Sequence, residues 1–105
     1  MVFPNDSDGD ALQRLAERSD MSQPMDIDFF VDVPDREAGN EVARLAGDIG
    51  YKSIVEFDES SQRWTCYCTR HMVATYAGVL EAQHQLDALS APFGGRSDGW
   101  GTSGT

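Results

Sequence analysis

The segment MDIDFFVDV, residues 25–33, alternates apolar and polar residues almost without interruption. Successive side chains of a β-strand point to opposite faces, so this period of two predicts a strand with one buried face. The side expected to be buried carries Met25, Ile27, Phe29, Val31 and Val33. The other side carries Asp26, Asp28, Phe30 and Asp32. Such a strand needs a second layer of structure over its apolar face. The three aspartates on its opposite face need a separate explanation.

Helical spacing of apolar residues alternates with further strand-like segments. The segment 33–50 is amphipathic, with Asp35 as the expected helix cap and Gly50 as the residue that ends the helix. The other expected elements are a helix over about 8–18, capped by Asp6, Ser7 or Asp8, strands over 51–57 and 63–70, a helix over 72–90 limited by Pro92, and a short final strand centred on 98–102.

This order predicts an α+β fold. Without the first helix it reads βαββαβ, the order of a ferredoxin-like sandwich, in which an antiparallel sheet carries both long helices on one face. A chain of 105 residues suits one domain over 1–105, in which 93–105 is a glycine-rich C-terminal segment. Trp100 favours docking of that segment, because a large ring seldom stays in solvent.

Period-two alternation also assigns the other strands to faces. The strand side chains expected to face the helices are Tyr51, Ser53, Val55, Phe57, Trp64, Cys66 and Cys68. The helix side chains expected to face the sheet include Ile49 in the second helix and Val73, Tyr76, Leu80, Leu86 and Leu89 in the last helix. The opposite sheet face would carry Lys52, Ile54, Glu56, Thr65, Tyr67 and Thr69 beside the aspartates and Phe30. Exposed aromatic residues surrounded by polar ones are typical of a protein interface.

The formal net charge is −10 and the isoelectric point is near 4.3. This charge argues against direct binding of nucleic acid or an anionic membrane and permits a basic protein partner, with plain solubility as the alternative. No signal peptide or membrane-spanning run is recognised, so a cytoplasmic location is expected. Cys66 and Cys68 are too close along one strand for a favourable disulfide, which fits a reducing compartment.

Metal binding and catalysis find little support. Aspartates two residues apart on a strand are about 6–7 Å apart, which is too far for one small cation. The run Asp6, Asp8, Asp10 resembles a calcium loop but has Ala11 where the loop needs glycine. The remaining candidate ligands are Cys66, Cys68, His71 and His84, without the paired spacing of a zinc site. No nucleotide-binding glycine loop, serine triad or paired acids appear, so neither an enzyme nor a cofactor is predicted.

Motifs at both ends resemble one family. NDSDGDAL at 5–12 and SDGWGT at 97–102, together with WTCYCT at 64–69, resemble the RraB family of regulators of ribonuclease E activity. Its most specific part here is DGWG, formed by Asp98, Gly99, Trp100 and Gly101. The resemblance implies a ferredoxin-like α+β fold and a non-catalytic protein that binds and inhibits ribonuclease E.

The hypothesis from the sequence is therefore a regulatory protein, monomer or homodimer, that binds ribonuclease E or a related basic RNA-processing enzyme. Asp26, Asp28 and Asp32 would supply charge complementarity, and Phe30 and Tyr67 would be apolar anchors. The DGWG residues would have a structural role. The alternatives are a metal- or small-ligand-binding domain and a module that homodimerises through its open sheet face.

Overall fold

The computed structural model of the chain describes residues 6–102. Their elements in chain order are α1 (Ser7–Ala16), β1 (Pro24–Val33), α2 (Arg36–Asp48), β2 (Lys52–Asp58), β3 (Arg63–Val73), α3 (Tyr76–Ser90), the 3-10 turn η1 (Ala91–Phe93) and β4 (Arg96–Thr102). The strands form one sheet in the order β2-β3-β1-β4, and all neighbouring strands are antiparallel. The predicted α+β class is confirmed.

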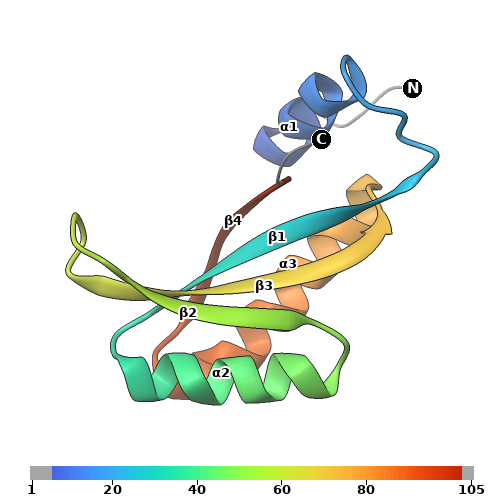
Figure 1. Cartoon of the computed structure of the whole chain (residues 1–105). Coiled ribbons are helices and arrows are strands. Elements are labelled where there is room, and N and C mark those ends of the chain that lie inside the picture. Colours follow the sequence, from blue (N-terminus) through green and yellow to red (C-terminus); the bar gives the residue numbers. More distant parts are fainter. Residues whose placement is uncertain (1–5, 103–105) are drawn as a thin grey trace.

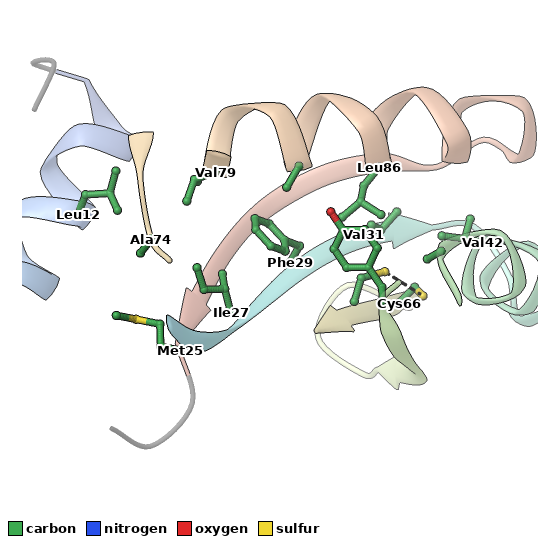
Figure 2. Close-up of a cluster of buried hydrophobic side chains, with 14 of the residues drawn as sticks. Leu12, Met25, Ile27, Phe29, Val31, Val42, Cys66, Ala74, Val79 and Leu86 are labelled. Atoms are coloured by element: carbon green, nitrogen blue, oxygen red, sulfur yellow. Dashed lines mark hydrogen bonds between the residues drawn. The ribbon is translucent and has the colours of Figure 1, made fainter. Parts of the chain in front are cut away.

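The apolar side of β1 forms the centre of the core. All five of its predicted residues are buried, and they pack with the buried faces of α2 and α3, represented by Val42, Val79 and Leu86. Figure 2 shows Ile27, Phe29 and Val31 of this strand between the sheet and the helices. In Figure 1, α2 and α3 run along the sheet, whereas α1 lies beyond its far end, next to the end of β4. Leu12 and Leu15 of α1 extend the same core at that end.

Side-chain caps fix where the helices begin. Of the three candidates for α1, Asp6 is the cap, and its carboxylate accepts from the Gly9 amide at 2.8 Å. Asp35 caps α2 as predicted, at 2.8 Å from the Ala38 amide. Each such cap typically contributes about 1 kcal/mol. Gly50, with φ of +102°, takes the left-handed conformation just after α2, as predicted from its place in the sequence.

The helix predicted over 72–90 begins later, at Tyr76. Met72 and Val73 belong instead to β3, where they pair with Met25 and Pro24 of β1. Val73 was therefore wrongly assigned to a buried helix face, since it is exposed at the end of a strand. The long β1 supplies hydrogen-bonding partners for these residues, and this pairing overrides their helical spacing. Within residues 6–102, none of the helices combines the length and apolar character needed to cross a membrane.

Two other residues assigned to the core are exposed. Ile49 lies past the last turn of α2, in the short connection that leads to β2. Phe57 lies near the end of the edge strand β2, which has a neighbouring strand on one side only. Its ring packs edge-on against Trp64, with the ring centroids 5.4 Å apart. Both predictions failed because periodicity gives the face of a residue and not its distance from the end of the element.

Candidate functional site

The sheet face that points away from α2 and α3 is called the open face here. Strand pairing places side chains in rows across it, with Asp26 opposite His71, Asp28 opposite Thr69, Phe30 opposite Tyr67 and Asp32 opposite Thr65. On β2, Lys52, Ile54 and Glu56 continue the rows of Thr69, Tyr67 and Thr65. The predicted partner-binding residues therefore share one face, and the alternation of β1 was assigned in the correct register.

The three aspartates of β1 have different surroundings. Asp26 is exposed and pairs with the His71 ring at 2.9 Å, and Asp28 accepts from the Thr69 hydroxyl at 2.5 Å. Asp32 is buried, with only 9% of its surface accessible. A stripe that looks uniform in the sequence thus contains two residues near solvent and one that is enclosed.

Asp32 is enclosed because two arginines converge on it. The Arg63 Nε donates to both carboxylate oxygens, at 3.0 and 2.8 Å, and the Arg96 Nε lies 3.6 Å from Oδ2. Arg63 comes from β3 and Arg96 from β4, so the ion pair links the central strand to both of its neighbours. The charge of Asp32 is therefore used inside the chain, and Asp26 and Asp28 are the aspartates of β1 that face outward.

An apolar row crosses the middle of the open face. The rings of Phe30 and Tyr67 meet edge to face, with centroids 5.5 Å apart and planes at 80°. Ile54 lies opposite Tyr67 on β2 and is 63% exposed, the most exposed large apolar residue among those described. The sequence placed Ile54 on this face but did not single it out as an anchor. Its position beside Tyr67 follows from the β2–β3 register, which a single sequence does not specify.

The DGWG segment uses both faces of β4. The pairing of β1 with β4 shifts between Phe29 and Val31, so that Asp98 and Gly99 both lie opposite Phe30. Gly99 has a φ of +105°, a conformation that favours glycine, and a Cβ on Gly101 would lie 3.5 Å from the Phe30 ring. The two glycines thus leave the Phe30 ring against a bare stretch of backbone, and the bulge directs Asp98 onto the open face.

Trp100, between these glycines, lies on the opposite side of β4. It pairs with Phe29, packs against the core, and its indole Nε1 donates to the Asp8 carboxylate at 3.0 Å. Asp8 also accepts from Gln83 of α3 at 3.3 Å. Asp8 of the N-terminal motif and Trp100 of the DGWG motif, from opposite ends of the chain, therefore meet beside α3.

Comparison with known families gives a match over nearly the whole chain. The family described as "RraB: Regulator of ribonuclease activity B" matches residues 5–102. The chain belongs to the RraB family. No curated protein matches it individually. The family description is that of a regulator of ribonuclease activity, which agrees with the resemblance carried by the end motifs.

The thiols of this RraB-family chain lie away from the open face. Cys66 and Cys68 are free and fully buried on the helix side of β3, with their Sγ atoms 3.7 Å apart (dashed line in Figure 2). The hydrogen bond that they share, together with burial, raises the pKa of Cys66, and the same bond lowers the pKa of Cys68. His71 points to the opposite face, so these three candidate ligands do not converge.

Two aspartates of the N-terminal motif, Asp6 and Asp8, also accept hydrogen bonds within the chain. Asp6 caps α1 and accepts a hydrogen bond from the Tyr76 hydroxyl, which lowers the pKa of the Asp6 carboxyl. Asp8 holds the Trp100 indole. Across residues 6–102, no three His, Cys, Asp or Glu side chains are grouped closely enough to hold a metal ion. Asp6 therefore serves as a helix cap, Asp8 holds Trp100, and the two cysteines pack in the core.

Proposed function

We propose that this RraB-family protein regulates ribonuclease E, or a related basic RNA-processing enzyme, by binding it through the open face and inhibiting cleavage. The observation that carries the proposal is the apolar row Ile54–Tyr67–Phe30, accessible to solvent in the middle of an acidic sheet face. A central apolar cluster within a polar rim is the usual anatomy of a protein interface. The role is non-catalytic, because the row offers contact area and no reacting groups.

Charge would act mainly on the rate of encounter. The net charge of −10 attracts a basic partner over distances comparable with the Debye length, about 8–10 Å in physiological salt. Asp26 and Asp28 stand beside the apolar row and would meet basic side chains at its rim. Rim charges chiefly change the association rate and its salt dependence, whereas central apolar contacts set the lifetime of the complex.

The proposed mode of binding requires a fold that leaves one face of the sheet uncovered. We infer a single ferredoxin-like domain with an additional N-terminal helix, supported by the strand order β2-β3-β1-β4 and by the position of α1 at the end of the sheet. In such a sandwich one sheet face remains available for a partner. The free thiols of Cys66 and Cys68 fit a reducing compartment and support the cytoplasm as the place of action.

The test is binding to purified ribonuclease E at several salt concentrations, together with cleavage of a fluorescent RNA. The double variant Asp26→Asn/Asp28→Asn should bind about three- to tenfold more weakly at low salt and show a flatter salt dependence. The matched control Glu37→Gln/Asp48→Asn removes the same charge from α2, on the other side of the molecule. Equal losses in both double variants, or unimpeded RNA cleavage by ribonuclease E at saturating protein, would refute the proposal.

Homodimerisation through the open face is the competing use of the apolar row. In a symmetric dimer the same acidic rim would face itself, and like charges brought together oppose association. Light scattering of the free protein distinguishes the two, because a dimer formed through this face would have twice the monomer mass and would dissociate when ribonuclease E binds.

A further inference from the structure

A small hollow on the open face combines two aromatic rings with a carboxylate. It measures about 170 Å³ and is lined by Phe30, Thr65, Tyr67 and Asp98. Sites for small-molecule ligands usually measure roughly 300–1,000 Å³, so this hollow has room for a single side chain. It lies at the Phe30 end of the apolar row, where the β4 bulge brings Asp98 opposite Phe30.

The lining joins aromatic rings to a carboxylate. Aromatic faces attract cations within about 6 Å, and arginine is the cation most often found there. The chain already makes such contacts elsewhere, since Arg36 lies 5.4 Å from the Trp64 ring centroid and Arg70 lies 5.0 Å from that of Tyr51. In the described part of the chain, no arginine lies over the rings of Phe30 or Tyr67 in this way.

Asp98 differs from Asp32, a β1 carboxylate on the same sheet face that lies two residues from Phe30. Asp32 is held by Arg63 and Arg96, whereas Asp98 is exposed and has no cationic group within 4 Å among residues 6–102. The left-handed conformation of Gly99 and the register shift beside it place Asp98 on the open face, next to Phe30. The most specific motif of the chain therefore places an unneutralised carboxylate next to two aromatic rings.

We propose that this hollow, the Asp98 notch, binds one arginine side chain of the protein partner. The guanidinium group would stack on the aromatic pair, donate to the Asp98 carboxylate and reach the Thr65 hydroxyl oxygen. Arginine fits better than lysine, because its planar, weakly hydrated group can stack and donate two hydrogen bonds at once. The identity of the partner rests on the proposed function, whereas the affinity of the notch for arginine does not.

The experiment is an NMR titration of the ¹⁵N-labelled chain with a blocked glycine–arginine–glycine tripeptide. The amides of Phe30, Thr65, Tyr67 and Asp98 should shift together at millimolar peptide, and Asp98→Asn should weaken binding by about three- to tenfold. The lysine peptide should bind more weakly, and the uncharged citrulline peptide should cause no shifts. Asp48→Asn on α2 is the matched control and should leave the titration unchanged.

Shifts spread over the whole acidic surface, or equal binding of the lysine and arginine peptides, would overturn the notch proposal. The same variants in the ribonuclease E assay separate the two proposals. Normal binding of ribonuclease E by Asp98→Asn would refute the notch as a contact while leaving the proposed function intact. If the notch binds the arginine peptide but the protein does not bind ribonuclease E, the result would support the notch and refute ribonuclease E as the partner.

Discussion

Asp32→Asn should destabilise the fold far more than the same change at Asp26, although both residues belong to one alternating stripe. The Asp32 side chain is 13% exposed, and its two oxygens share one bifurcated hydrogen bond from the Arg63 Nε, at 3.0 and 2.8 Å. Asparagine keeps the shape but removes the charge and one acceptor oxygen. It leaves Arg63 and Arg96 facing each other without a carboxylate between them.

The magnitude follows from how exposed the partners are. Hydrogen bonds to charged groups contribute about 1.5–3 kcal/mol, and breaking a fully buried ion pair costs about 3–5 kcal/mol. Arg63 is 41% exposed and Arg96 73%, so solvent screens part of this energy and we expect a loss of about 1–2 kcal/mol. In a domain of this size, 1 kcal/mol shifts the melting temperature by about 4–8 °C.

The assay is urea unfolding followed by circular dichroism, with Asp26→Asn as the control. Asp26 and its partner His71 are 60% and 66% exposed, so that variant should stay within about 0.5 kcal/mol of the parent. Equal effects of the two variants would refute the assignment of Asp32 to a structural ion pair, and so would an Asp32→Asn protein as stable as the parent.

Two further predictions concern the ends and the interior of the molecule. Trp100→Phe removes the hydrogen bond to Asp8 and should loosen α1 before the rest of the chain. Hydrogen exchange of the α1 amides should be about tenfold faster, equivalent to about 1.4 kcal/mol, while exchange of the β3 amides stays unchanged. Faster exchange throughout the chain would contradict local docking of α1 by Trp100. The two cysteines should resist alkylation by iodoacetamide in the native protein and react readily in urea, because both are fully buried, and rapid native labelling would contradict this packing.

Much of the fold was predictable because its strongest signals are local. The alternation of β1, the Asp35 cap and Gly50 each depend on neighbouring residues, and each matches the structure. The start of α3 was misplaced because Met72 and Val73 suit either period, and their state is decided by pairing with the distant Pro24 and Met25. Sequence periodicity does not contain that information.

The candidate site was predictable only in outline. Period two placed Phe30 and Tyr67 on one face, but their contact and the proximity of Ile54 depend on strand register. The two arginines that enclose Asp32 come from other strands, so nothing in the local pattern distinguishes this aspartate from Asp26 and Asp28. Periodicity in the sequence does not predict strand register or ion pairs between distant residues.

If the partner binds the open face, a photoreactive side chain placed on that face should form a cross-link to it. A photoreactive benzoylphenylalanine would replace Ile54, 63% exposed on the open face, or Ile49, 37% exposed at the end of α2 in the helix layer. We predict a cross-linked product with ribonuclease E from position 54 and none from position 49. Cross-linking from position 49 alone would contradict binding through the open face and place the interface on the helices.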